Sequence, residues 1–135
     1  MTADIIAELH GARAAERTQA LFYRALASMA EVGNDAALAE RLNGLHADEQ
    51  HHLSRLSARL LELGEKLEDL GPPSLPEVGL EAWESLARQR EQVEIDRYTT
   101  LLEQDLDAHT RNMLDEFLQS ERHHAESLGG KWMDA

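Results

Sequence analysis

Two short motifs that pair a carboxylate with an imidazole are the residues best suited to chemistry in this chain. Glu49 and His52 form one Glu-x-x-His motif, and Glu121 and His124 form the other. Residues three apart lie on one face of a helix, about one turn from each other. Carboxylate oxygens and imidazole nitrogens are both ligands for first-row transition metals. Each motif can therefore offer two ligands to one metal ion from a single helix face.

Acids also interrupt the apolar stripes that helical spacing predicts elsewhere in the chain. Glu16 interrupts one stripe, and Glu91, with Glu94 one turn later, interrupts another. Burying these carboxylates costs several kcal/mol each and adds their mutual repulsion. A pair of bound cations would remove both costs, because the carboxylates would then be ligands. The alternative is that these acids and histidines simply face solvent.

The absence of cysteine limits the kind of metal site that the chain can build. It excludes disulfides, thiolate metal sites, iron–sulfur clusters and cysteine nucleophiles. An oxygen-rich ligand set with one imidazole per ion suits iron or manganese, or a mixed pair, better than structural zinc. We therefore expect two iron ions, with manganese as the alternative.

Four amphipathic helices must position these ligands. We expect helices over residues 3–31, 35–64, 79–105 and 107–128, with a proline-containing connector over 65–78. Helix-forming residues dominate the composition, and aromatic residues make up 4% of the chain, so the fold class is all-α. The length suits one domain over residues 1–135. The arrangement we expect is a four-helix bundle of two antiparallel hairpins joined by a long crossover between the second and third helices.

The positions of the two turns test whether the ligands reach the same depth. Midway between Glu16 and Glu49 lies the Val32–Gly33 turn, and midway between Glu91 and Glu121 lies the 105–107 break. In an antiparallel hairpin, residues at equal distance from the turn share a level. Each hairpin should therefore bring its lone glutamate level with its Glu-x-x-His motif.

The connector must be long enough to join parallel second and third helices. At about 1.5 Å per residue, it has to span roughly 36 Å along the bundle. Residues 65–78, fully extended, reach roughly 46 Å. A crossover is feasible with little slack.

The two halves of the chain also look like a weak internal duplication. Glu16 is followed by Tyr23 seven residues later, as Glu91 is followed by Tyr98. The sequence Glu-Gln-His-His at 49–52 likewise corresponds to Glu-Arg-His-His at 121–124. Such a repeat predicts a pseudo-twofold site to which each half donates one lone glutamate and one Glu-x-x-His motif.

This ligand pattern resembles that of the ferritin-like di-iron carboxylate proteins over nearly the whole chain. Within that superfamily the sequence looks most like the di-iron domain of rubrerythrins, because Glu94 offers an extra acid after Glu91. The resemblance implies that Glu16 and Glu91 are terminal ligands and that Glu49 and Glu121 are bridging ligands. It implies that His52 and His124 are nitrogen ligands and that Glu94 is an auxiliary ligand. It also implies that Tyr23 and Tyr98 surround the ligands without binding metal. Many rubrerythrins carry a cysteine-ligated rubredoxin segment, which this chain lacks, so electrons would come from an external donor.

The function we expect is that of a di-iron oxidoreductase that reduces hydrogen peroxide, or dioxygen, as a diferrous centre is oxidised. One alternative is a ferroxidase or iron-storage protein. Others are a non-catalytic metal-binding protein and an oxygen-activating hydroxylase. The net charge of −13 argues against a nucleic-acid partner, and no apolar run is long enough to span a membrane. We expect a cytoplasmic homodimer, with a larger oligomer as the alternative.

Overall fold

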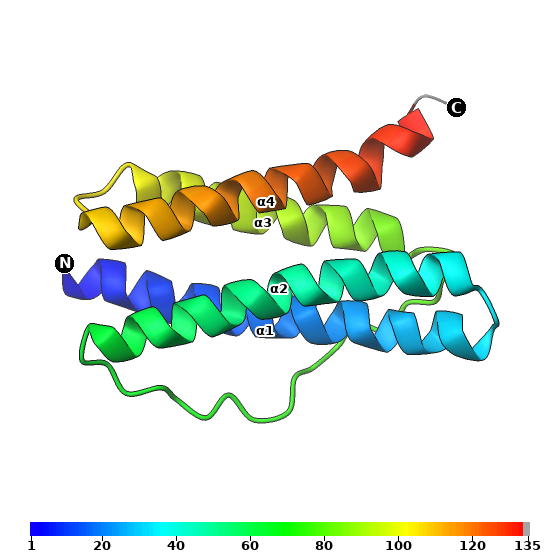
Figure 1. Ribbon diagram of the computed structural model, residues 1–135, viewed down its shortest axis with the longest axis horizontal. Coiled ribbons are helices and arrows are strands. Elements are labelled where there is room, and N and C mark those ends of the chain that lie inside the picture. Colours follow the sequence, from blue (N-terminus) through cyan, green and yellow to red (C-terminus); the bar gives the residue numbers. More distant parts are fainter. Residues whose placement is uncertain (134–135) are drawn as a thin grey trace. The chain divides into compact units, whose positions relative to one another are not determined.

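The computed structural model describes the backbone of residues 1–133 and the side chains of residues 1–128, so the last two residues of the expected domain lie outside it. The described residues form four α-helices and no strand, which confirms the all-α fold class. The helices are α1 (Ala3–Val32), α2 (Ala36–Glu62), α3 (Trp83–Leu102) and α4 (Ala108–Met133) (Figure 1). The chain divides into two compact units: unit 1 is Met1–Ala12 with Glu84–Ala135, and unit 2 is Arg13–Trp83.

Unit 2 contains the antiparallel hairpin of α1 and α2, whose turn lies where the sequence predicts it (Figure 1). Asn34 takes a left-handed conformation with φ of 59°. The Asp35 N–H then donates to the Ala30 carbonyl over 2.9 Å, and the Asn34 N–H donates to the Glu31 carbonyl over 3.1 Å. This pair of bonds ends α1 in a Schellman motif. Asp35 begins α2, because its side chain accepts the Leu38 N–H over 3.2 Å.

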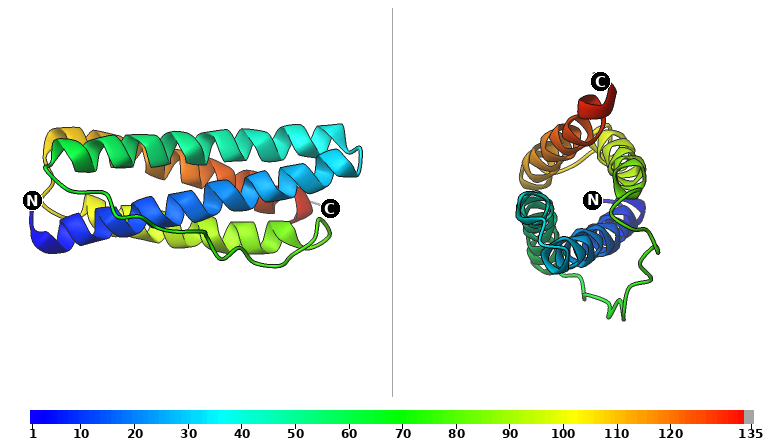
Figure 2. Two further views of the ribbon diagram at one scale, coloured as in Figure 1. Left: turned by 90° about the horizontal axis from the view of Figure 1, so that it is seen from below. Right: turned by 90° about the vertical axis from the view of Figure 1, so that its right-hand side faces the viewer.

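The long connector of unit 2 returns along the hairpin to the other end. Gly64, with φ of 84°, ends α2, and the connector over residues 63–82 runs back beside α1 (Figures 1 and 2). Arg13 Nη1 holds the connector by donating to the Glu68 carbonyl over 3.1 Å. The Trp83 ring then packs edge-on against the Tyr23 ring, with 6.4 Å between the ring centroids. The Arg41 guanidinium carbon lies over the Trp83 ring, 5.4 Å from its centroid. The expected crossover is thus confirmed.

Unit 1 contains the antiparallel hairpin of α3 and α4 together with the first residues of α1. Asp107 begins α4 by accepting the Thr110 N–H over 2.7 Å. The Arg111 guanidinium donates to the carbonyls of Leu102 and Gln104 over 2.8 and 2.7 Å. Arg111 therefore satisfies carbonyl groups that the end of α3 leaves open.

Four helix ends differ from the expected positions by two residues or more. The third helix begins at Trp83 rather than at residue 79, because residues 79–82 form a turn in which the Ala82 N–H donates to the Gly79 carbonyl. It ends at Leu102 rather than 105, and the second helix ends at Glu62 rather than 64 because Gly64 closes it. The fourth helix continues past the expected end at 128 to Met133. Each glycine at 129 and 130 costs a helix only about 1 kcal/mol, so the pair does not stop it.

The apolar stripes form the core of each unit. In unit 2 the buried side chains include Phe22, Leu26, Leu42, Leu56 and Leu60. In unit 1 Tyr98 packs on Phe117 at 5.8 Å, among further buried side chains that include Leu101, Met113 and Leu128. Within the described part of the chain, no helix is both long and apolar enough to cross a membrane.

Candidate metal centre

Unit 2 brings together Glu16 of α1 with Glu49 and His52 of α2, which we call the Glu16 half-site. His52 Nδ1 lies 3.5 Å from Glu16 Oε2 and 3.9 Å from Glu49 Oε1. Both glutamates are fully buried, and His52 is 4% exposed. The hairpin turn places the three residues level, as equal distances from the turn require. Each of them offers a ligand atom within 4.8 Å of the others.

Unit 1 repeats this arrangement in Glu91 of α3 with Glu121 and His124 of α4, which we call the Glu91 half-site. His124 Nδ1 lies 3.5 Å from Glu91 Oε1 and 3.5 Å from Glu121 Oε1. Both glutamates are fully buried, and His124 is 2% exposed. The alternative that the motif residues face solvent is therefore wrong in both units.

The spacing of the ligand atoms fits a shared cation better than it fits direct hydrogen bonds. A good N–H···O bond measures about 2.7–3.2 Å, which is shorter than the four separations given above between imidazole Nδ1 and carboxylate oxygen. Two ligands about 2.1 Å from one ion lie about 3.0 Å apart at a right angle and about 3.4 Å apart at the tetrahedral angle. The observed 3.5–3.9 Å needs only a small contraction to reach that range. Two carboxylates and one imidazole in a dry core are a donor set that suits iron or manganese.

The residue one turn after each lone glutamate distinguishes the half-sites. In unit 2 this residue is Gln19, which is buried and donates from Nε2 to the Tyr23 hydroxyl over 3.0 Å. In unit 1 it is Glu94, which is also buried and whose Oε1 lies 3.5 Å from Arg97 Nε. Glu94 therefore faces a guanidinium, and its expected role as an auxiliary metal ligand stays a prediction.

Gln19 and Arg97 are the residues that sequence reasoning missed. The duplication itself could have identified Gln19, because it follows Glu16 by the same three residues that separate Glu94 from Glu91. Arg97 follows Glu94 by another three residues, on the same helix face. Charged residues are common on α3, so composition alone does not single it out.

The two tyrosines lie in the core beside the half-sites. Tyr23 and Tyr98 are both fully buried. The Tyr23 ring lies 5.8 Å from the Phe22 ring, measured between centroids, and it also contacts the Trp83 ring. The Tyr23 hydroxyl accepts a hydrogen bond from Gln19 Nε2. Tyr23 therefore orients the residue beside Glu16 without occupying a ligand position itself.

Three further histidines lie close to the motifs in sequence. His51 and His123 are exposed, as expected from their positions about 100° around the helix. His46 Nδ1 lies 2.8 Å from the Ala20 carbonyl oxygen, so it joins α2 to α1 within unit 2. None of these three belongs to either half-site.

Comparison with known proteins places this arrangement in a family. The family model described as Ferritin, a ferritin-like domain, matches residues 6–131. The chain belongs to the ferritin-like domain family. No curated protein matches it at a significant level.

Solved structures show the same fold at low identity. A Mycobacterium tuberculosis bacterioferritin, BfrA, superposes with a TM-score of 0.89 at 18% identity, covering 98% of this chain and 86% of its own. A mycobacterial bacterioferritin gives a TM-score of 0.89 at 20% identity, with coverage of 98% and 85%. The fold is therefore the ferritin-like four-helix bundle. The closer likeness to rubrerythrins stays a prediction.

Proposed function

We propose that the two half-sites together form one di-iron centre at which the protein oxidises ferrous iron. The observation that carries the proposal is the repeated set of two buried carboxylates and one buried imidazole in each unit. In this proposal Glu16 and Glu91 are terminal ligands, Glu49 and Glu121 bridge the two ions, and His52 and His124 supply the nitrogen ligands. The matched depth of the ligands about their two turns supports such a shared centre.

The four glutamates of the half-sites would balance the charge of the two ions, and the buried surroundings would keep water away from them. Two divalent ions carry four positive charges, and the four glutamates of the half-sites offer four negative ones. Neither set is stable alone in a dry core, because an isolated buried ion costs several kcal/mol. Each carboxylate would attract a ferric ion more strongly than a ferrous ion, which would help the loss of an electron from each ferrous ion.

The reaction balances with dioxygen as oxidant. Two ferrous ions each lose one electron, and dioxygen takes both electrons with two protons to give hydrogen peroxide. With hydrogen peroxide as oxidant, the two electrons and two protons instead give two water molecules. Ferritin-like family membership and the bacterioferritin structures that share the fold support iron as the substrate.

Peroxide reduction is the second candidate, and Glu94 favours it. That carboxylate is buried one turn from Glu91, where the rubrerythrin resemblance implies an auxiliary ligand. We place this candidate second because Glu94 faces Arg97. A homodimer and an external electron donor stay predictions.

Stopped-flow mixing of the anaerobic ferrous protein with dioxygen, or separately with peroxide, tests the proposal. A ferroxidase gives rapid oxidation with dioxygen, followed by renewed turnover when ferrous iron is added again. Faster oxidation by peroxide, with turnover that requires an added reductant instead, would favour the second candidate. The proposal fails if about two metal ions bind per chain and neither oxidant oxidises them.

A further inference from the structure

The two half-sites differ most at the residues that follow their lone glutamates. Unit 2 has the neutral pair Gln19 and Phe22, whereas unit 1 has the charged pair Glu94 and Arg97 at the same offsets. A buried carboxylate is stable when a cation compensates it. In unit 1 the compensating cation is the Arg97 guanidinium. Unit 2 has the uncharged Phe22 at the corresponding position.

Arg97 joins the surface of unit 1 to its buried carboxylate. Its Nη1 donates to Glu8 Oε2 on α1 over 3.0 Å, while its Nε lies 3.5 Å from Glu94 Oε1. The Glu8 side chain is 56% exposed, that of Arg97 is 24% exposed and that of Glu94 is 4% exposed. The guanidinium thus has one carboxylate partner in solvent and another in the core.

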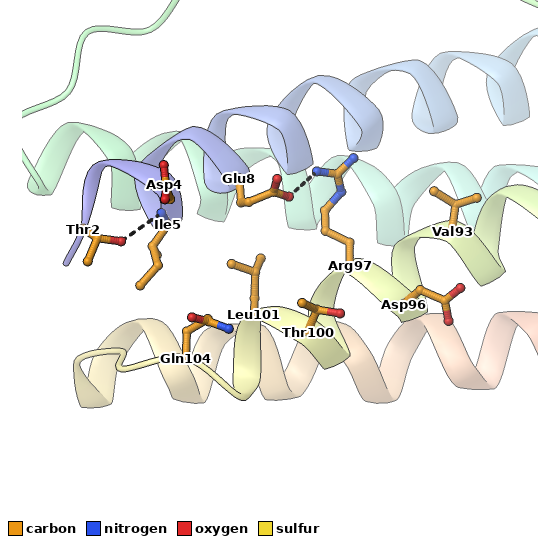
Figure 3. Close-up of a pocket in the computed structure, with 10 residues that line it drawn as sticks. All are labelled: Thr2, Asp4, Ile5, Glu8, Val93, Asp96, Arg97, Thr100, Leu101 and Gln104. Atoms are coloured by element: carbon orange, nitrogen blue, oxygen red, sulfur yellow. Dashed lines mark hydrogen bonds and ion pairs between the residues drawn. The ribbon is translucent and has the colours of Figure 1, made fainter.

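Arg97 also lines a groove of about 700 Å³ between the start of α1 and α3. Figure 3 shows its side chain reaching across from α3 to Glu8, with Thr100 and Leu101 one turn further along α3. Asp96 lines the same groove, so carboxylates accompany the guanidinium there. Arg97 therefore both lines the groove and lies beside Glu94.

Gly11 provides the space that the guanidinium occupies. A Cβ atom at this position of α1 would lie 2.9 Å from Arg97 Nη1, closer than real Cβ contacts allow. A glycine inside a helix costs about 1 kcal/mol relative to alanine. Because the neighbouring atoms belong to the end of a flexible side chain, an alanine at position 11 would displace Arg97 and leave α1 intact.

We propose that Arg97 gates the entry of iron from this groove to the Glu91 half-site by occupying Glu94. The proposal rests on the proposed function, since it assigns the route by which the ferrous substrate arrives. A divalent cation replaces the guanidinium at Glu94, and Arg97 keeps its second carboxylate, Glu8, as it withdraws. Glu94 then passes the ion to Glu91, one turn away on the same helix. Arg97 is accordingly a positioning residue, and the gate exists on unit 1 alone because Gln19 carries no charge.

Anaerobic Co²⁺ uptake tests the gate independently of turnover, since Co²⁺ absorbs visible light when protein ligands replace water. Opposite unit charges about 4 Å apart interact by about 1.4 kcal/mol at an effective dielectric constant of about 60, so releasing Glu94 from Arg97 is worth about tenfold in rate. We expect Arg97→Gln to accelerate Co²⁺ association about tenfold. Arg88→Gln, which makes the same charge change at an exposed position of α3, should leave the rate unchanged.

Two glycine variants test the gate without removing the guanidinium. Gly11→Ala should accelerate Co²⁺ uptake, because the new methyl group displaces Arg97. Gly44→Ala is the matched control: it lies in α2 and a Cβ there meets nothing within 4 Å. Both changes improve helix propensity by about 1 kcal/mol. Faster uptake in Gly11→Ala alone would therefore come from the displaced side chain.

The Glu94→Gln background decides whether Arg97 acts through Glu94. If it does, adding Arg97→Gln to Glu94→Gln changes the uptake rate less than about twofold, against about tenfold in the wild-type background. The gate is overturned if folded Arg97→Gln and Gly11→Ala both take up Co²⁺ at the wild-type rate. The proposed function fails in a different way, through wild-type protein that binds Co²⁺ but does not oxidise ferrous iron.

Discussion

The Glu16 and Glu91 half-sites contain the same three residue types, two glutamates and a histidine, and differ in the residues that surround them. In both, a lone glutamate meets a Glu-x-x-His motif across an antiparallel hairpin, with the nearest oxygen 3.5 Å from the imidazole Nδ1. One turn later the Glu16 half-site has an amide bonded to a tyrosine, and the Glu91 half-site has a carboxylate facing an arginine. In the proposed centre, the bound metal would require these residue types at the ligand positions. The residues around them are free to give the two halves separate tasks.

Removing ligands from both half-sites should have the largest effect. A residue that supports a metal ligand contributes about 10- to 100-fold in affinity, and a ligand itself should contribute at least as much. Glu49→Ala combined with Glu121→Ala should therefore weaken metal binding by at least about 10²- to 10⁴-fold. The metal-free variant should also unfold at a higher temperature than metal-free wild type, because like charges no longer repel each other in the core. Metal analysis and thermal melts measure both effects.

The matched controls are the exposed acids Glu40 of α2 and Glu126 of α4. Their alanine variants should keep the wild-type metal content. Unchanged metal content in the Glu49 and Glu121 double variant would show that the ligand assignment is wrong.

Exchanging the residues that distinguish the half-sites should have the next largest effect. Gln19→Glu buries a carboxylate beside Phe22, which cannot compensate it, so the metal-free protein should lose about 3 kcal/mol or more of unfolding free energy. Bound metal should restore much of this loss. Urea unfolding with and without Co²⁺ measures this loss of unfolding free energy.

Glu94→Gln is the reverse exchange and should lower the unfolding free energy by less than about 1 kcal/mol, because Arg97 retains its ion pair with Glu8. Equal losses in the two variants would contradict the comparison.

The helix caps of the two hairpins should contribute equally. Asp35 begins α2 in unit 2 and Asp107 begins α4 in unit 1, each by accepting an N–H three residues later. Asp35→Ala and Asp107→Ala should each lower the free energy of unfolding by about 1 kcal/mol, measured in urea. A difference of several kcal/mol between them would mean that one cap also supports its half-site.

The smallest expected effect is the pH dependence that Glu31 gives to unit 2. Hydrogen bonds from Arg24 and then Asn43 lower the pKa of Glu31 below its ordinary value. The stability that this contact contributes is therefore present above the ordinary glutamate pKa of about 4.3 and is lost as the pH falls through the lowered pKa. Glu31→Gln should remove that part of the acid dependence in urea unfolding at a series of pH values. In unit 1 Arg111 donates to carbonyl groups that do not titrate, so Arg111→Gln should leave the dependence unchanged.

Much of the fold could be predicted from sequence because the hairpins carry local signals. Val32–Gly33 marks one turn and residues 105–107 mark the other, and equal spacing from each turn predicts which candidate ligands share a level. The start of α3 was harder to predict, because the turn over residues 79–82 depends on a local hydrogen bond of the connector.

The partner of Glu94 could not be predicted. A carboxylate on a buried face can meet a metal ion or a guanidinium, and both satisfy the same electrostatic need. The arginine lies on the same helix, so its position three residues later was visible. Its second partner, Glu8, comes from a helix far away in the sequence, and only packing brings the two together.

An aerobic ferrous titration followed by near-ultraviolet absorbance tests whether the two half-sites form one centre. A single shared centre predicts that absorbance from ferric iron rises steeply up to about two ions per chain and then bends, because one centre holds two ions. It also predicts that Glu16→Ala and Glu91→Ala each abolish the steep phase, since both halves serve one centre. A steep phase that persists at about one ion per chain in either variant would show that the half-sites work separately, and would contradict the account.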